Sequence, residues 1–222
     1  MLTTIEKLQA MGSGINVFST QELARFLGSN KTQRYKQFIK PAIDNGELIR
    51  IKRGIYMISP KQAPVKLNEY SIAHELVNES YVSFETALSY HQWIPEKVTV
   101  IASAIVGRKS LSYKTPLGLF EYQNISVDPA QFFTGVSREE VNGKTFWIAS
   151  PLRALADLIF ERAWQWVGID FLTDGLRIDD DELETLESID FENIIEVYRT
   201  KKFYRAKRVN TFLVQLRKVL GK

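Results

Sequence analysis

The sequence contains no cysteine and only two histidines, His74 and His91. The lack of cysteine excludes disulfides, thiol catalysis and cysteine-ligated zinc. His74 has no metal-ligating residue three or four positions further along the chain, and two separate histidines make a poor zinc site. The sequence therefore predicts no metal site.

Long apolar runs and common enzyme motifs are also missing. No run of about 18 apolar residues is present, so no membrane-spanning helix is predicted. Residues 1–14 lack the charged start and continuous apolar stretch of a secretory signal, which makes the cytoplasm the expected location. The chain has neither a glycine-rich phosphate loop nor a Gly-x-Ser-x-Gly nucleophile elbow. We therefore expect a globular protein without catalytic residues or cofactors.

The charges are segregated along the chain. Residues 1–64 carry a net charge of +6, residues 65–200 carry −11, and residues 201–222 carry +8. Attraction to a polyanion depends on local charge rather than on the total of +3. The two basic ends are therefore the candidate surfaces for a nucleic acid.

A helix-turn-helix is predicted near the N-terminus. Ser19 and Glu22 form a capping box at the start of a helix over residues 20–27, and Gly28 permits a tight turn. The apolar face of the next helix recurs at helical spacing and consists of Tyr35, Phe38, Ile39, Ala42 and Ile43. Pro41 is expected to kink or end this helix near Lys40.

A two-stranded hairpin follows this helix. Ile49 and Ile51 are expected to face the core and Arg50 and Lys52 to face outward, with a turn at Arg53-Gly54. With a first helix at about residues 4–11, this order predicts a winged helix-turn-helix domain over residues 1–62. Residues 59–68 contain two prolines and are predicted to be a linker.

The polar face of this domain predicts DNA contacts. A recognition helix presents its early residues to base edges, where glutamine can bind adenine and Arg or Lys can reach guanine or phosphate. The predicted DNA-binding residues are Thr32, Gln33, Arg34, Lys36, Gln37 and Lys40 in the helix, and Arg50, Lys52 and Arg53 in the wing. Two alternatives remain open: ordinary solvated faces of a small helical domain, and a winged helix that binds a protein.

Residues 63–222 are predicted to form a second, α+β domain. Helices are expected at 68–78 and 84–91, and strands at 98–103, within 105–113, and at 117–125, 132–137 and 144–149. Asn142-Gly143 predicts a hairpin. Ser150-Pro151 predicts the start of a helix whose buried stripe is Leu152, Leu155, Ala156 and Ile159.

Three segments of this domain follow one another in a recognisable order. They are SFETALSYHQWIPE (83–96), YKTPLGLFEYQNI (113–125) and WIASPLRALADLIF (147–160), after a predicted winged helix ending in RIKRGIY. This set resembles the AbiEi-type antitoxins of type IV toxin–antitoxin systems, over nearly the whole chain and most clearly over residues 18–160. The resemblance implies an antitoxin of a phage-defence system that represses its own operon and neutralises a nucleotidyltransferase toxin. The family has Glu-Lys where this chain has Leu152-Arg153.

The C-terminal third combines an acidic run with a basic tail. Residues 178–196 contain nine acidic and no basic side chains, and Leu183, Leu186, Ile189, Ile194 and Ile195 predict helices with the acids outward. A solvated face, a protein-binding face and a metal site are the alternatives for this run. The tail is predicted to be an amphipathic helix from Arg205, buried through Val209, Phe212, Leu213, Leu216 and Leu220.

The tail also carries a possible second basic surface, made of Lys201, Lys202, Arg205, Lys207 and Arg208. This surface is expected to contact a nucleic acid or a toxin, or to pair with the acidic run of the same chain.

The expected partners of this protein are duplex DNA at its own promoter and a cognate nucleotidyltransferase toxin, with no membrane. Paired or inverted DNA sites are expected, because one winged helix per chain is usually bound in pairs. Two other classes remain open. One is a transcriptional regulator whose second domain senses a ligand or a protein unrelated to a toxin. The other is a nuclease with a DNA-targeting domain.

Overall fold

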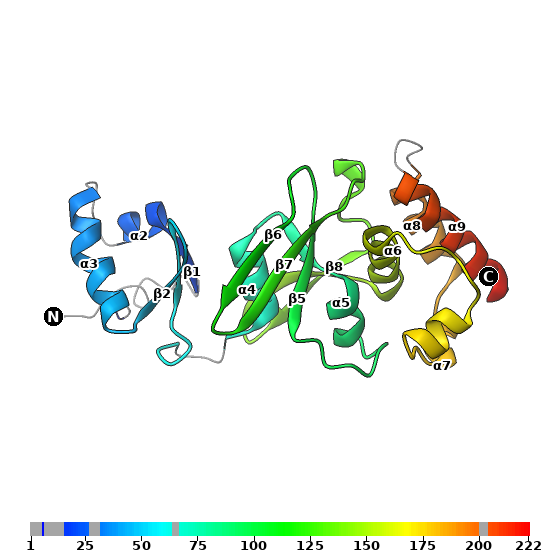
Figure 1. Cartoon of the computed structure of the whole chain (residues 1–222), viewed down its shortest axis with the longest axis horizontal. Coiled ribbons are helices and arrows are strands. Elements are labelled where there is room, and N and C mark those ends of the chain that lie inside the picture. The colour runs from blue at the N-terminus through cyan, green and yellow to red at the C-terminus, as the bar shows by residue number, and fades with distance from the viewer. Residues whose placement is uncertain (1–5, 7–15, 27–31, 64–66, 200–203) are drawn as a thin grey trace.

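The computed structural model describes residues 6, 16–26, 32–63, 67–199 and 204–222. The fold is mixed α+β, as the sequence predicted. Figure 1 shows a small N-terminal sheet with two helices, a central larger sheet, and a group of helices at the C-terminal end. We call residues 16–63 the head and residues 67–222 the body. Glu6 is helical, but the rest of the first helix predicted at about residues 4–11 and the turn at Gly28 lie outside the described residues.

The head consists of a three-stranded sheet and two helices. Its elements are β1 (Val17–Ser19), α2 (Thr20–Phe26), α3 (Thr32–Asp44), β2 (Leu48–Lys52) and β3 (Ile55–Ile58). The sheet is antiparallel in the order β1-β3-β2, so the last strand lies in the middle. The two strands of the predicted wing are confirmed, whereas β1 was not predicted.

The predicted capping box at the start of α2 is confirmed. The backbone N of Ser19 donates to Glu22 Oε2 at 2.7 Å, and the backbone N of Glu22 donates to Ser19 Oγ at 3.2 Å. Two backbone amides at the helix start are thereby satisfied by side chains. The turn between β2 and β3 contacts the start of α2, because Thr20 N donates to the carbonyl of Gly54 at 2.8 Å.

Of the two outcomes predicted for Pro41, a kink or an end of the helix near Lys40, the end is wrong. Pro41 lies inside the helix, which runs on to Asp44. Helical hydrogen bonding resumes beyond the proline, since Asn45 N donates to the carbonyl of Pro41 at 2.8 Å. Ile39 and Ala42, on either side of the proline, are both buried against the head sheet and hold the helix in place. After α3 the chain turns at Gly46, whose φ is +70°.

The head sheet is covered on both faces. Phe18, Tyr56 and Ile58 pack with the helices α2 and α3 in a small core. On the opposite face, Val17 and Met57 are buried in the large core of the body. Ile49 and Ile51 are half-buried against that same large core, which confirms that they face inward but places them against the body.

The first part of the body forms a six-stranded mixed sheet. Its elements are α4 (Glu69–Leu76), β4 (Ser80–Val82), α5 (Phe84–Tyr90), β5 (Val100–Ile105), β6 (Leu111–Thr115), β7 (Gly118–Asn124), the 3-10 turn η1 (Pro129–Gln131), β8 (Val136–Val141) and β9 (Lys144–Ala149). The strand order is β6-β7-β5-β4-β9-β8, with β5 parallel to β7 and β4 parallel to β9. The hairpin predicted at Asn142-Gly143 is confirmed, with φ of 54° and 72° at these residues.

The strand predicted at 132–137 is wrong. These residues begin with a turn, and β8 starts only at Val136. Gly135 has a φ of +73°, which breaks an extended backbone. Phe132 is buried on its own, with its ring 4.8 Å from that of Tyr81. An apolar pair in a turn, with only Phe132 buried, thus resembled a strand.

Two helices hold the central strands of the body sheet. On one face Tyr122 of β7 donates its hydroxyl to the carbonyl of Ala73 in α4 at 2.7 Å. Beside β5, the hydroxyl of Thr86 in α5 donates to the carbonyl of Val100 and accepts from the backbone N of Ala102, both at 2.9 Å. Thr86 therefore continues the hydrogen bonding of β5 where β4 has ended.

The C-terminal part of the body is helical. Its elements are α6 (Pro151–Arg162), the π-helical turn η2 (Phe171–Gly175), α7 (Asp180–Glu184), α8 (Ser188–Val197) and α9 (Tyr204–Val219). Ser150 caps α6 as predicted, and the predicted buried stripe of α9 is confirmed apart from Leu220, which is half-buried. Ile189 was predicted to be buried but is 52% exposed, because Phe191 takes the inward position on α8. Within the described ranges, no helix is long and apolar enough to cross a membrane.

Candidate functional site

The predicted DNA-reading residues of the helix lie on α3. Thr32, Gln33, Arg34, Lys36 and Gln37 belong to its first two turns, but their side chains lie outside what the structure describes. The backbone of α3 forms the outer edge of the described head, on the side away from the body (Figure 1). Lys40 is exposed, and its Nζ lies 3.2 Å from Asp44 Oδ2 one turn further on. An exposed pair of this kind is worth little energetically, so Lys40 can leave it for another partner.

The hairpin of β2 and β3 presents two unpaired cations and one engaged cation. Arg50 and Arg53 are exposed, and neither has a hydrogen-bond or ion-pair partner within the described residues. Lys52 is also exposed, but its Nζ donates to the hydroxyl of Tyr113 in β6 at 2.7 Å and lies 4.6 Å from the centroid of that ring. The sequence therefore placed Lys52 on the outside correctly but missed its contact with the body.

Glu75 of α4 holds the head to the body. Its Oε2 accepts from the backbone N of Asn16 at 2.9 Å and of Val17 at 3.0 Å, and its Oε1 lies 4.0 Å from Lys144 Nζ. Burial raises the pKa of Glu75, whereas the backbone hydrogen bonds from the head and the charge of Lys144 lower it. Beside this contact lies a cleft of about 860 Å³ between head and body. The wing cation Lys52 lines this cleft.

A fully buried ion pair joins four elements of the body. The side chains of Arg153 and Asp157 on α6 are both 0% exposed, with 2.9 Å between Arg153 Nε and Asp157 Oδ1. Asp157 also accepts from the hydroxyls of Tyr81 at 2.8 Å, Ser83 at 2.6 Å and Tyr198. Arg153 donates from Nη2 to the Tyr81 hydroxyl at 2.6 Å, and from Nη1 to the carbonyl at the turn before β8 at 2.8 Å. We call these five residues the Arg153 cluster.

The electrostatics of the Arg153 cluster favour a structural role. Burial by itself lowers the pKa of Arg153, but the negative charge of Asp157 raises it, so the guanidinium stays charged. Burial raises the pKa of both Tyr81 and Tyr198 well above its usual value. No group in this cluster is accessible to a substrate, because all five residues are buried.

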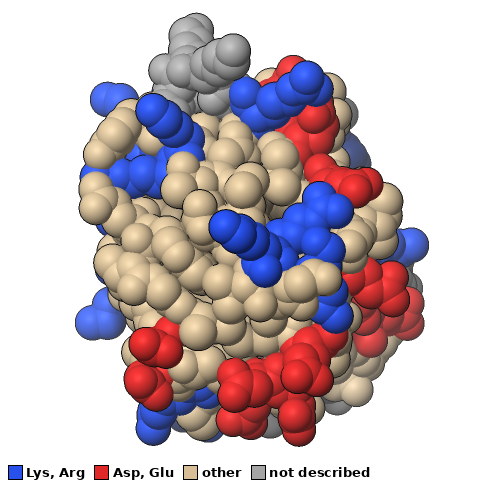
Figure 2. Space-filling view, turned by 90° about the vertical axis from the view of Figure 1, so that its right-hand side faces the viewer, with Lys and Arg blue, Asp and Glu red and all other residues tan. Residues whose placement is uncertain are grey.

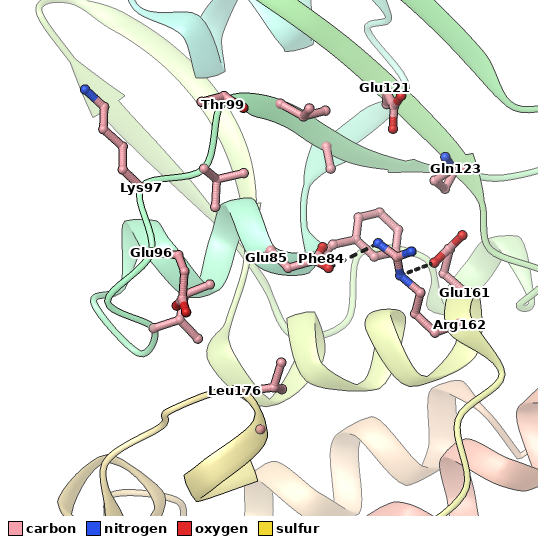
Figure 3. A pocket seen from close by; sticks show the side chains of 15 residues that line it. Phe84, Glu85, Glu96, Lys97, Thr99, Glu121, Gln123, Glu161, Arg162 and Leu176 are labelled. Carbon is pink, nitrogen blue, oxygen red and sulfur yellow. Dashed lines mark hydrogen bonds and ion pairs between the residues drawn. The ribbon is translucent and has the colours of Figure 1, made fainter. Parts of the chain in front are cut away.

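The body also contains a pocket of about 510 Å³ between β5, β7 and the ends of α5 and α6 (Figure 3). Its floor is apolar and includes Phe84 and Ile94. Arg162 Nη2 lies 3.3 Å from Glu85 Oε1, and Arg162 Nε lies 2.9 Å from Glu161 Oε2. Figure 3 shows Glu121 pointing from β7 toward the pocket, away from those ion pairs. The pocket can hold a small molecule, but it has no nucleophile paired with a base.

The acidic run and the basic tail meet at the C-terminal end of the body. Figure 2 shows acidic side chains along the lower edge of this face, and basic ones across its middle and upper parts. Arg217 Nη2 on α9 lies 3.2 Å from Glu192 Oε1 on α8, and Lys222 Nζ donates to the carbonyl of Glu184 at 3.0 Å. The tail therefore pairs in part with the acidic run, as one of the alternatives predicted.

The predicted second basic surface is only partly described. Lys201 and Lys202 lie outside the described residues. Arg205 Nη1 donates to the backbone carbonyl of Glu161 at 2.9 Å, which uses this guanidinium to satisfy the end of α6. Lys207 and Arg208 line a hollow on α9 with Trp166 and Tyr204. Arg205 therefore has a structural role, whereas Lys207 and Arg208 border the hollow.

The part of the chain that the structure describes contains no group of three or more His, Asp or Glu residues able to hold a metal ion. His91 Nε2 lies 2.9 Å from the carbonyl of Ala149, and His74 Nδ1 is buried without a partner. Comparison with protein-family models and with curated proteins gives no match to this chain.

Sequence reasoning missed the Arg153 cluster. A signal for it was present, since Arg153 and Asp157 lie four residues apart on a helix that is otherwise apolar around them. That spacing predicts an ion pair but does not show burial. The partners Tyr81, Ser83 and Tyr198 come from distant parts of the chain and carry no local signal.

Proposed function

We propose that the head is a winged helix-turn-helix that binds duplex DNA. The observation that carries this proposal is the position of α3, which follows the capped helix α2 and forms the outer edge of the described head (Figure 1). A second helix that is open to solvent can enter the major groove, while the first helix crosses the backbone. The strand order β1-β3-β2 behind the helices fits a wing made of β2 and β3.

The charges of the wing support the same proposal. Arg50 on β2 and Arg53 in the turn after it are exposed, with no described carboxylate to neutralise them. Lysine and arginine side chains of this kind bind phosphates without reading sequence. The glutamines at positions 33 and 37 on α3 are the side chains suited to adenine. Phosphate contacts thus come from the wing and base contacts from α3.

We propose further that the chain is an antitoxin that represses its own operon and counteracts a nucleotidyltransferase toxin. This part rests on the resemblance of residues 83–96, 113–125 and 147–160 to AbiEi-type antitoxins. These segments correspond to α5 with its exit, to β6 and β7, and to β9 with α6. All of these elements contribute to one core, which supports treating the body as a single antitoxin domain.

The DNA-binding proposal is tested by titrating the protein with labelled DNA from upstream of its own gene. A scrambled duplex of the same length is the control, and both titrations are repeated from 50 to 200 mM salt. Tighter binding to the upstream DNA, with a steep salt dependence, supports an operator-reading head. Equal and weak binding to both duplexes contradicts it.

Three variants assign the contacts. Gln33→Ala is expected to weaken binding to the upstream DNA by about 1–3 kcal/mol and to leave the scrambled duplex unaffected. Arg53→Ala is expected to weaken both duplexes alike and to lower the salt slope by about 1. Arg138→Ala removes the same charge from an exposed position on β8 and serves as the matched control. If all three variants bind alike, the assigned faces of the head are wrong.

The pocket of Figure 3 favours a second candidate function, a regulator whose body binds a small ligand. Co-expression of this chain with a nucleotidyltransferase encoded next to it separates the two candidates. Restored growth supports the antitoxin. Persistent toxicity, with operator binding intact, favours the ligand-sensing regulator.

A further inference from the structure

A hollow of about 400 Å³ lies on the outer side of α9, against the segment that follows α6. Tyr204, Lys207, Arg208 and Thr211 line it from α9, and Trp166 lines it from the preceding segment. Gln215 lines it too, and these five α9 residues recur at i, i+3, i+4, i+7 and i+11, so they form one stripe along the helix. This stripe lies beside the buried stripe that holds α9 to the body and takes no part in that packing.

The hollow contains an open aromatic platform. Tyr204 is 65% exposed, which is unusual for a ring of this size. Arg208 lies over one face of this ring, with its Cζ 4.4 Å from the ring centroid and its Nη2 donating to the Tyr204 hydroxyl, so a base can stack only on the other face. Trp166 is half-buried, and its ring meets that of Phe212 edge-on at 5.5 Å, which anchors it to the core. Two aromatic rings are therefore held in place at the rim of the hollow.

The hollow is also electropositive. No acidic residue lines it, and Lys207 is exposed without an ion-pair partner within the described residues. Arg208 lies against an aromatic ring rather than a carboxylate, and its Nε is buried without a hydrogen-bond partner. The neighbouring Arg217, by contrast, is neutralised by Glu192.

This combination selects one ligand chemistry. An exposed aromatic ring stacks on a flat π system, and Lys and Arg side chains without a carboxylate partner attract a phosphate. A nucleotide has both groups, and a volume of about 400 Å³ is in the range of small-molecule sites. Bases in a duplex are stacked on each other and cannot reach a tyrosine, so the nucleotide must be unpaired.

We propose that this hollow binds one unpaired nucleotide, with its base on Tyr204 and its phosphate on Lys207 and Arg208. A single-stranded nucleic acid and a free mononucleotide share this chemistry, and the experiment distinguishes them. The site lies on the body and is independent of the duplex-binding head proposed above.

The test measures binding of a labelled oligothymidylate of ten nucleotides to the full-length chain by fluorescence anisotropy. Thymidine monophosphate is added as a competitor in one arm, and an unlabelled duplex of the same length in another. Wild-type protein is expected to bind the oligothymidylate, and the duplex to compete more weakly than unlabelled single strand. Effective competition by the monophosphate indicates a free-nucleotide site, and weak competition indicates a strand site.

Three variants of α9 decide the proposal. Tyr204→Ala is expected to weaken binding by about 5- to 150-fold, while Tyr204→Phe keeps the ring and most of the affinity. Lys207→Gln is expected to lower the salt slope by about 0.7, the value for one phosphate of a single strand. Lys218→Gln, an exposed lysine of α9 outside the hollow, is the matched control and should change nothing.

Several outcomes would overturn this proposal. They are no binding of the oligothymidylate by the wild type, equal binding by Tyr204→Ala and the wild type, and stronger competition by the duplex than by the single strand. The double variant Gln33→Ala/Arg53→Ala separates this site from the head, because it should lose duplex binding and keep the oligothymidylate. Either proposal can thus fail while the other stands.

Discussion

Replacing Asp157 by alanine tests the Arg153 cluster most directly. The carboxylate of Asp157 is fully buried and accepts hydrogen bonds from Arg153, Tyr81, Ser83 and Tyr198. Alanine removes the negative charge and leaves the buried guanidinium without its counter-ion. Solvent does not screen this pair, because both side chains are 0% exposed.

The expected loss of stability is large. Removing one partner of a buried ion pair costs about 3–5 kcal/mol, because the remaining charge stays desolvated. For a chain of 222 residues this corresponds to a fall in Tm of about 6–20 °C. Urea unfolding followed by circular dichroism gives the free energy of unfolding, and a thermal scan gives the Tm. The individual hydrogen bonds are not added to this figure, since the groups of one network are not additive.

The double variant Arg153→Met/Asp157→Ala provides the control. It removes the orphaned charge, so it should be more stable than Asp157→Ala alone. Asp157→Asn keeps the shape of the side chain but not its charge, and should fall between the wild type and Asp157→Ala. A cost of Asp157→Ala below about 1 kcal/mol, or exact additivity of the changes at the two positions, would refute the reasoning.

Three further predictions concern stability. Burial lowers the pKa of the His74 imidazole below its usual 6.5, so the unfolded chain takes up a proton at a higher pH than the folded chain. The urea midpoint should therefore drop as the pH falls below about 6.5, and His74→Gln should reduce that drop. Gly135→Ala places a Cβ 2.5 Å from Ile194 Cδ1, whereas the Cβ of Gly143→Ala, at a similar φ, meets open space. Urea unfolding should show the Gly135→Ala variant to be about 1–3 kcal/mol less stable than the Gly143→Ala variant, and equal losses would contradict the clash. Tyr122→Phe removes a buried hydroxyl that donates to a carbonyl of α4 and should cost about 1 kcal/mol in the same assay, with no change in operator binding.

Signals carried by neighbouring residues predicted the fold well. The capping box of Ser19 and Glu22, the hairpin at Asn142-Gly143 and the helix start at Ser150 are all present where the sequence placed them. Each depends on hydrogen bonds or dihedral angles within three or four residues, so the local sequence contains the whole cause. The amphipathic stripe of α9 was predictable for the same reason.

Elements that depend on distant partners were missed or misjudged. The strands β1 and β4 have three residues each, too few for an alternating pattern, and they are strands because β3 and β5 lie beside them. Pro41 stays inside α3 because residues on both sides of it are buried against the sheet. Ile189 is exposed because Phe191 fills the core position instead. The candidate site shows the same division, since the exposed cations of the wing were predicted and the contact of Lys52 with Tyr113 was not.

The sequence alone determined the α+β class, most helices and strands, the segregation of charge and the candidate DNA-contacting residues, because these follow from composition and from interactions between near neighbours. Only the tertiary structure decided which cations are free and which are engaged. Arg53 and Lys207 have no described partner. Lys52, Arg153 and Arg205 are held by groups far away in the chain, which for Arg153 are the Tyr81 hydroxyl and the carbonyl of Thr134. The physical reason is that an ion pair or a hydrogen bond depends on distances of a few ångströms in space, and the order of residues does not specify those distances between remote segments.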